Sequence, residues 1–283
     1  MSASKGRPLR SRAASAIRGL VFDVDGTLVL SDRSLGNYEV LPGAQAVLTK
    51  LRERGFPFVL LTNGSAYPPA EQAAKLRRIG LPVDDEQMLT PSSVAADLFA
   101  RRGFRRVLVL GGPGVGFALR AAGIETVQPG EPAAGRVDAV YVGWHPACSM
   151  PDIEAAANAI WSGAALYTAS DVPFFATKGG RTLGYSYAII GALRRLTRAP
   201  VTIVGKPSLH AMRYAARRLQ LAVPGVGVVG DDPLVEVLMA RRAHATAIGV
   251  TTGVTSAAVW RAQRELRRPH HVLRQLGDIL KLV

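Results

Sequence analysis

Cysteine is almost absent from this chain, since Cys148 is the only one among 283 residues. A single cysteine excludes a disulfide within the chain and fits a reducing compartment, so we expect a cytoplasmic protein. Long apolar runs are also lacking, and none approaches the roughly 18 residues that a membrane helix needs. We therefore expect no membrane partner.

Acidic residues are scarce beside basic ones, with 21 Asp and Glu against 35 Lys and Arg and a net charge of +14. Residues 1–18 contain five basic residues and no acid, and residues 261–283 contain six basic and two acidic residues. Because residues 1–18 also lack the apolar segment of a secretory signal, we expect a basic, disordered tail there. No nucleic-acid-binding motif accompanies the charge, so we expect no nucleic-acid partner and a field that attracts small anions.

Short apolar runs recur along the rest of the chain, each closed by glycine or a polar residue, with amphipathic segments between them. This alternation predicts an α/β fold with a Rossmann-like parallel sheet that is covered on both faces. Helical spacing predicts helices within 42–55 and 207–220 and a closing helix over 271–280. The eight predicted strands lie within residues 20–26, 56–64, 106–112, 139–144, 165–170, 200–208, 225–232 and 245–253.

Four of the predicted strands end in a charged or hydroxyl residue beside glycine, namely Asp23, Thr62, Lys206 and Asp231. The carboxyl ends of parallel strands share one edge of a sheet, so these side chains converge if the strands are neighbours. Asp23 and Asp25 would repel each other there unless a cation compensates them. Hard oxygen ligands favour Mg²⁺, with Lys206 as a second positive charge; the alternative is an ordinary acidic turn.

The same segments resemble, in order, the four signature motifs of the haloacid dehalogenase-like hydrolase superfamily. The motifs are DVDGT (23–27), LLTNG (60–64), GKP (205–207) and GDD with a later acid (230–236), each of which closes a predicted strand. The resemblance extends from about residue 19 to the C-terminus. It implies the fold of that family, a Rossmann-like core with an inserted cap.

The resemblance assigns the chemistry to the two aspartates of the first motif. Asp23 would be the nucleophile that forms an aspartyl phosphate, and Asp25 the general acid and base, with a pKa raised by its neighbour. The side chains of Asp23 and Asp231 and the backbone carbonyl of Asp25 would bind Mg²⁺.

The second and third motifs would hold the phosphoryl group. The Thr62 hydroxyl would donate to it, aided by the backbone N–H groups of Asn63 and Gly64, and Lys206 would neutralise it together with Asp23. The alternatives are a β-branched residue that merely ends a strand and a solvated lysine.

Two further acids in the fourth motif complete the expected site. We expect Glu236 to act through a metal-bound water or through Lys206, with a simple acid in the first turn of a helix as the alternative. Asp232 is equally placed to bind the metal or to cap the helix.

The spacing of the motifs indicates where a cap is inserted. Thr62 follows Asp23 by 39 residues, whereas Lys206 follows Thr62 by 144 residues, and this second interval has its own alternation of strands and helices. The expected division is a small α/β cap at 85–198 within a core at 19–84 and 199–283. A cap in this place is similar to subclass IIA of the family, which implies a small phosphate monoester as substrate. Caps of this kind often pair subunits, so a homodimer is left open.

Substrate selection is expected in two cap loops, within residues 143–149 and 169–180. The candidates for contact with the leaving group are Trp144, His145, Asp171, Phe174 and Phe175. Plain packing of the cap is the alternative for the aromatic residues. Cys148 follows His145 by three residues, but without a third group to orient the pair we expect a packed cysteine.

Taken as a set, the motifs predict a Mg²⁺-dependent phosphatase that acts on a small phosphate monoester. The alternative is a protein of the same fold that binds a phosphate ligand without turnover.

Overall fold

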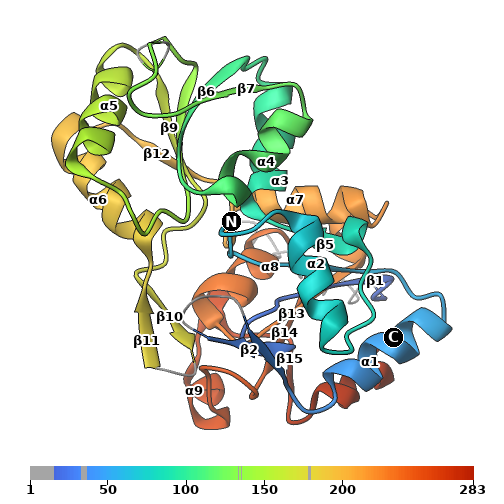
Figure 1. The fold of residues 1–283 in the computed structure, drawn as a ribbon. Helices are drawn as coiled ribbons and strands as arrows, with labels where there is room; N and C mark the ends of the chain where they lie inside the picture. Colours follow the sequence, from blue (N-terminus) through green and yellow to red (C-terminus); the bar gives the residue numbers. More distant parts are fainter. Residues whose placement is uncertain (1–15, 33–36, 133, 135, 178–179) are drawn as a thin grey trace, which may run out of the picture.

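The computed structural model describes residues 16–32, 37–132, 134, 136–177 and 180–283, so most of the predicted basic tail at 1–18 lies outside the described residues. The described chain forms two lobes, each built on a sheet (Figure 1). We call them the core lobe, with a six-stranded sheet, and the cap lobe, with a five-stranded sheet.

Both sheets are parallel throughout, so the predicted α/β class is confirmed. The core sheet, in the order β15-β14-β13-β1-β4-β5, contains β1 (Gly19–Phe22), β4 (Phe58–Leu61), β5 (Met88–Leu89), β13 (Val226–Gly230), β14 (Thr246–Val250) and β15 (His271–Leu273). The cap sheet, in the order β12-β9-β8-β6-β7, contains β6 (Arg106–Leu110), β7 (Glu125–Val127), β8 (Ala139–Val142), β9 (Ala165–Thr168) and β12 (Val201–Ile203). Each of the eight predicted strands is present.

Helices cover both faces of the sheets (Figure 1). They are α1 (Ala44–Glu53), α2 (Pro69–Arg78), α3 (Pro91–Arg101), α4 (Pro113–Ala121), α5 (Met150–Trp161), α6 (Tyr185–Thr197), α7 (Leu209–Arg218), α8 (Leu238–Arg242) and α9 (Ala257–Ala262). The predicted helices within 42–55 and 207–220 are confirmed as α1 and α7.

Side chains of β1 alternate between two apolar clusters, as a strand covered on both faces requires. Leu20 and Phe22 pack in the cluster that contains buried residues of α1. Val21 belongs to a second cluster, which includes residues of α3 and α7 and continues into the cap lobe through Val107 and Tyr141. The two lobes therefore share apolar packing next to the strand that carries Asp23.

Two antiparallel hairpins stand outside the main sheets: β2 (Val29–Ser31) with β3 (Tyr38–Val40), and β10 (Phe174–Thr177) with β11 (Gly180–Leu183). The β10–β11 hairpin extends from the cap lobe alongside the core lobe (Figure 1). It thereby carries residues that belong to the cap sequence toward the edge of the core sheet.

The predicted closing helix over 271–280 is wrong. Residues 271–273 form β15, which pairs with β14, and a short 3-10 helix follows at Leu276–Lys281. Pairing at the sheet edge satisfies the backbone N–H and C=O groups that a helix would otherwise satisfy. The apolar spacing reflects burial all the same, because Leu273, Leu276 and Ile279 are buried in the core lobe.

The strand before Lys206 does not belong to the core sheet, so the condition that all four motif strands are neighbours in one sheet holds for three of them only. β12 pairs with β9 in the cap sheet, while β5, inside the expected cap interval 85–198, pairs with β4 in the core sheet. By strand pairing, the chain leaves the core sheet after Leu89 and the cap sheet after Ile203. A division into lobes at these two points is our proposal for the domain boundaries.

Candidate active site

A cavity of about 680 Å³ lies between the lobes. Its core side contains Asp23, Asp25, Thr62, Lys206 and Asp231, together with other residues of the four motifs. The structure therefore brings together residues from distant parts of the chain, as the edge of a parallel sheet allows.

Asp23 directly follows β1 and is held by the sheet itself. Its N–H donates to the carbonyl of Val229 at 2.9 Å, and its carboxylate accepts a hydrogen bond from the hydroxyl of Thr27 at 3.2 Å. Gly26 turns the chain back at a φ of +82°, and a side chain there would also collide with the Asp231 carboxylate. Glycine at this position thus lets the first and fourth motifs approach each other.

Asp25 has a carboxyl oxygen, Oδ1, that is buried and has no hydrogen-bond partner within the described part of the chain. Burial raises the pKa of Asp25 to about 6, and the charge of Asp23 adds to this effect. The raised pKa follows the expectation, but its main cause is burial and not the neighbouring carboxylate. A carboxyl group with this pKa can release and accept protons near neutral pH.

Lys206 lies between two acids at the bottom of the cavity. Its Nζ atom contacts Asp23 Oδ1 and lies 2.7 Å from Glu236 Oε1, and only 2% of the residue is exposed. Burial alone lowers the pKa of Lys206, but the charges of Asp23 and Glu236 outweigh it and hold the pKa above its usual value. Lys206 is therefore a permanent cation beside Asp23.

Asn63 positions Lys206 through its side chain, which sequence reasoning missed. Its Oδ1 accepts from the N–H of Lys206 at 2.8 Å, and its Nδ2 donates to the Lys206 carbonyl at 3.0 Å. A side chain at Gly205 would collide with Asn63 Oδ1 and with the carbonyl of Ala169. This pairing brings Lys206 to the core site although its strand belongs to the cap sheet.

Thr62 directly follows β4 and continues the pairing with β5, since its N–H donates to the carbonyl of Leu89 at 3.1 Å. Its hydroxyl oxygen accepts from the N–H of Gly64 at 2.9 Å. This bond uses the oxygen as an acceptor, so the hydroxyl hydrogen remains for a ligand in the cavity.

Asp231 and Glu236 complete a group of acids around Asp23. Asp231 accepts from the N–H of Val254 at 2.7 Å, and burial, reinforced by the charge of Asp23, raises its pKa. Burial also raises the pKa of Glu236, against the lowering effect of Lys206. Of the two roles expected for Glu236, the structure shows its contact with Lys206.

Asp232 caps the helical turn that follows the fourth motif. Its Oδ1 accepts from the N–H of Leu234 at 2.7 Å, and a π-helix at Pro233–Val237 follows. The N–H of Asp232 donates to Glu236 Oε2 at 3.3 Å, which links the cap to the buried acid. Of the two roles open to Asp232, helix capping is the one in place.

Three carboxylates could hold a divalent cation. Asp23, Asp231 and Glu236, which we call the carboxylate cluster, are buried and each offers an oxygen within 4.8 Å of the others. Lys206 supplies one positive charge to three acids, so a further cation would balance the cluster. An all-oxygen donor set suits a hard ion such as Mg²⁺, and these residues therefore fit the metal expected from the sequence.

Aromatic side chains line the cap side of the cavity. Trp144 lies 5.9 Å from Phe175 and 4.6 Å from Tyr185 between ring centroids, and Arg181 lies 4.4 Å from the ring of Phe174. We call Trp144, Phe174, Phe175 and Tyr185 the aromatic wall. Tyr185 and Arg181 were not singled out from the sequence. The only features that marked them were, for Tyr185, a helix start after Gly184 and, for Arg181, its place as the one basic residue of the 180–183 strand.

His145 and Asp171, expected among the substrate contacts, are not among the described residues that line the cavity. Their neighbours Trp144, Ser170 and Val172 do line it. The N–H of Trp144 donates to the hydroxyl of Ser65 at 3.0 Å, a link between the lobes that the sequence did not predict. None of the helices described in the structure is long and apolar enough to cross a membrane.

Comparisons with known proteins agree with this geometry. A family model described as haloacid dehalogenase-like hydrolase matches residues 20–125, and a HAD-hydrolase-like model matches residues 203–279. Chronophin of Mus musculus is 27% identical, over 98% of this chain and 96% of its own length. D-glycerol 3-phosphate phosphatase of Mycobacterium tuberculosis is 30% identical, over 93% of this chain and 72% of its own length.

A solved structure is also similar across both lobes. The glycerol phosphate phosphatase of Mycobacterium tuberculosis in complex with magnesium matches with a TM-score of 0.81 and 29% identity. The match covers 94% of this chain and 77% of that one.

Proposed function

The chain belongs to the haloacid dehalogenase-like hydrolase family, within subclass IIA, and on that premise we propose that it is a Mg²⁺-dependent phosphatase of small phosphate monoesters. The observation that carries the proposal is the contact of Lys206 with both Asp23 and Glu236 at the bottom of the cavity. A buried ammonium beside a buried carboxylate is suited to bring a phosphate dianion up to that carboxylate.

Asp23 is the proposed nucleophile. One of its carboxylate oxygens forms a bond to phosphorus while the ester P–O bond breaks, which leaves a phospho-aspartate and an alcohol. Lys206 offsets the negative charge that would otherwise repel the two reactants. The support is positional, since Asp23 is 6% exposed and lies on the cavity beside Lys206.

Asp25 is the proposed proton donor and acceptor. Its protonated carboxyl gives a proton to the leaving alkoxide, and its carboxylate then takes a proton from the water that hydrolyses the phospho-aspartate. Phosphate leaves and Asp23 is regenerated. A pKa raised to about 6 supports both roles within one cycle.

Thr62 and the following backbone N–H groups of Asn63 and Gly64 are proposed to bind the phosphoryl oxygens, and all three residues line the cavity. The side chains of Asp23 and Asp231 and the backbone carbonyl of Asp25 are proposed to hold Mg²⁺, while Glu236 acts through Lys206. When bound, the ion supplies positive charge that lowers the repulsion between phosphate and carboxylates. A cytoplasmic location belongs to the same proposal and is supported by the single cysteine.

Release of phosphate from p-nitrophenyl phosphate tests the proposal. We expect turnover with Mg²⁺, none after chelation, and a loss of at least about 10⁴-fold in kcat in Asp23→Asn. Asp278→Asn, at a half-buried position of the C-terminal 3-10 helix, is the matched control and should keep full activity. Phosphate binding without turnover, in several monoesters and with Mg²⁺ present, would favour the non-catalytic alternative.

A further inference from the structure

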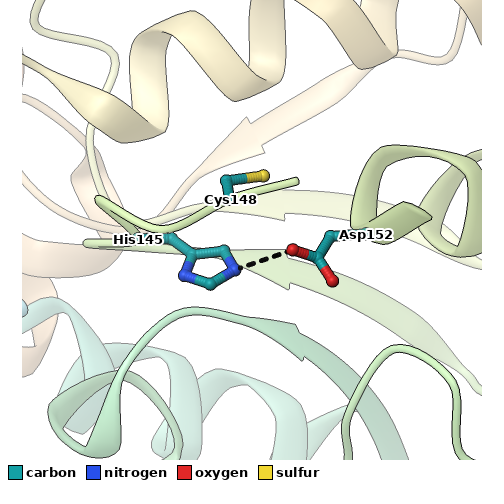
Figure 2. Close-up of side chains that lie close together, drawn as sticks. All are labelled: His145, Cys148 and Asp152. Atoms are coloured by element: carbon teal, nitrogen blue, oxygen red, sulfur yellow. Dashed lines mark ion pairs between the residues drawn. The ribbon is translucent and has the colours of Figure 1, made fainter. Parts of the chain in front are cut away.

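A second group of donor side chains lies in the cap lobe, outside the cavity. His145 and Cys148 come from the loop after β8, and Asp152 from the first turn of α5 (Figure 2). Each offers one ligand atom, and the three atoms lie within 4.8 Å of one another. We call these residues the cap cluster.

Two of the three donors already have the separation that a metal site requires. His145 Nε2 lies 3.4 Å from Asp152 Oδ2. In a tetrahedral zinc site with the usual bond lengths, nitrogen and oxygen ligands lie about 3.3 Å apart, and sulfur and nitrogen about 3.6 Å apart. The Cys148 sulfur lies within 4.8 Å of both other ligand atoms, so it has to move by no more than about 1 Å to reach such a separation.

The local backbone holds the cluster in place. The N–H of Cys148 donates to the carbonyl of His145 at 3.2 Å, which closes a turn between the two donors. Asp152 Oδ2 accepts from the N–H and the hydroxyl of Ser149 at 2.8 and 2.9 Å, so the acid is fixed at the start of α5. The Ser149 hydrogen bonds therefore orient Oδ2, the same oxygen whose separation from His145 Nε2 suits a metal ligand. Hydrogen bonds of this kind orient metal-ligating carboxylates.

The cluster is not arranged as a cysteine nucleophile. Burial, and then the charge of Asp152, raises the pKa of the Cys148 thiol, whereas a nucleophilic cysteine needs a lowered pKa. A plain ion pair between His145 and Asp152 would account for two of the residues. Cys148 also packs against the apolar cluster of the cap lobe, as expected from the sequence, and its thiol donates to the carbonyl of Ser149 at 3.9 Å.

We propose that His145, Cys148 and Asp152 bind a transition-metal cation of the Zn²⁺ type, with water as the fourth ligand. Imidazole and thiolate donors select such ions over Mg²⁺, which separates this site from the all-oxygen carboxylate cluster. The side chains of His145 and Asp152 are 21% and 20% exposed, which leaves room for an ion and a water molecule to enter. Three protein ligands and one open position form a known type of zinc site.

The position of the site links it to the cavity. Trp144 precedes His145, belongs to the aromatic wall and bonds through its N–H to Ser65 of the core lobe. An ion bound at the cap cluster therefore fixes the loop that presents Trp144 to the substrate.

Titration of the full chain with Co²⁺, in excess Mg²⁺ to occupy the oxygen site, tests the proposal. Because Cys148 is the only cysteine, any thiolate-to-cobalt charge-transfer band in the near ultraviolet reports on this residue alone. We expect one such band that saturates at one Co²⁺ per chain and is displaced by one equivalent of Zn²⁺. Saturation at half an equivalent with a doubled molecular mass would instead mean that two chains share the ion, and would overturn the proposal.

Variants separate a three-ligand site from a lone thiol. Cys148→Ser should lose the band, and His145→Ala and Asp152→Asn should each weaken Co²⁺ binding at least about tenfold. Asp152→Asn keeps an oxygen for the Ser149 hydrogen bonds, so the fold of α5 is preserved. His271→Ala, at an exposed histidine of the core lobe, is the matched control. Wild-type affinity in both His145→Ala and Asp152→Asn, or no band in the wild type, would overturn the proposal.

Discussion

The two sides of the cavity differ in chemistry and in how their residues are held. On the core side, Lys206 and Glu236 are 2% and 3% exposed and carry ionisable groups. On the cap side, the aromatic wall is apolar, and Phe174 is 45% exposed. Backbone hydrogen bonds fix the core side, for example from the Val254 N–H to Asp231, whereas ring contacts such as that of Trp144 with Tyr185 hold the wall.

This difference indicates a division of labour. Groups that must meet a reacting atom need fixed positions, and the edge of a sheet supplies them. Groups that select a leaving group need only shape and apolar area. We therefore expect core-side substitutions to change kcat and wall substitutions to change KM.

Asp25→Asn should have the largest effect of the substitutions considered next, and its size should depend on the leaving group of the substrate. Loss of the general acid should lower kcat/KM, which reports the steps up to departure of the alcohol, by about 10²–10⁴-fold for an alkyl ester such as glycerol phosphate. The loss in kcat/KM should be far smaller for p-nitrophenyl phosphate, because that leaving group departs without a proton. Steady-state rates on the two esters provide the measurement, and equal losses in kcat/KM on both would contradict the role of Asp25 as general acid.

Lys206→Met should lower kcat by about 10²–10³-fold, because the charge that offsets Asp23 is lost. It should also lower the free energy of unfolding by about 3–5 kcal/mol, since Asp23 and Glu236 would remain buried without a positive charge beside them. Denaturant titration without metal measures this second effect, with the exposed Lys281→Met as the control.

A double variant, Lys206→Met with Glu236→Gln, separates the effect of Lys206 on activity from its effect on stability. Removal of the second acid should restore part of the stability but none of the activity. Recovery of activity in the double variant would show that Lys206 acts only on the fold.

The pH dependence should follow the raised pKa of Asp25. Because the general acid acts when protonated, kcat/KM for an alkyl ester should fall about tenfold per pH unit above that pKa of about 6.

The free energy of unfolding, measured without metal, should also depend on the ionisation of the Asp25 carboxyl group. Its contribution is full below the usual pKa of 3.8 and is lost as pH rises through about 6, because the folded state holds the proton more tightly. Asp25→Asn should remove both dependences, and their persistence in this variant would assign them to another group.

Trp144→Ala changes the cap side of the cavity and should have the smallest effect on the kinetics. We expect KM for an aryl phosphate to rise about tenfold, from lost ring contacts worth about 1–1.5 kcal/mol, with kcat nearly unchanged. Trp161→Ala, at a 62% exposed position of α5 in the same lobe, is the control. A fall in kcat without a rise in KM would break the proposed division between the two sides.

The sequence predicted the core side better than the cap side, for a physical reason. Buried parallel strands leave continuous apolar runs, and the residues that follow them, such as Asp23 and Asp231, are found by that pattern alone. The raised pKa of Asp25 was also predictable from two neighbouring acids, although burial is its larger cause.

Contacts between segments far apart in the sequence could not be predicted in this way. The Asn63 side chain holds the backbone of Lys206, and nothing in the T-N-G motif distinguishes this role from a turn residue. Asp152 joins His145 and Cys148 only because α5 begins where it does. Arg181 lies in the short β10–β11 hairpin and Tyr185 begins the next helix. A lone basic residue and a helix start after glycine occur in many loops, so neither feature places its residue on the cavity.

Identification of the phosphorylated residue tests the central claim most directly. The enzyme is mixed with substrate and Mg²⁺, quenched in acid during turnover, digested and mapped by mass spectrometry. A phosphoryl group on Asp23 is the predicted result. A phosphoryl group on another residue, or turnover in which water oxygen enters phosphate with no enzyme-bound phosphoryl at any quench time, would contradict it.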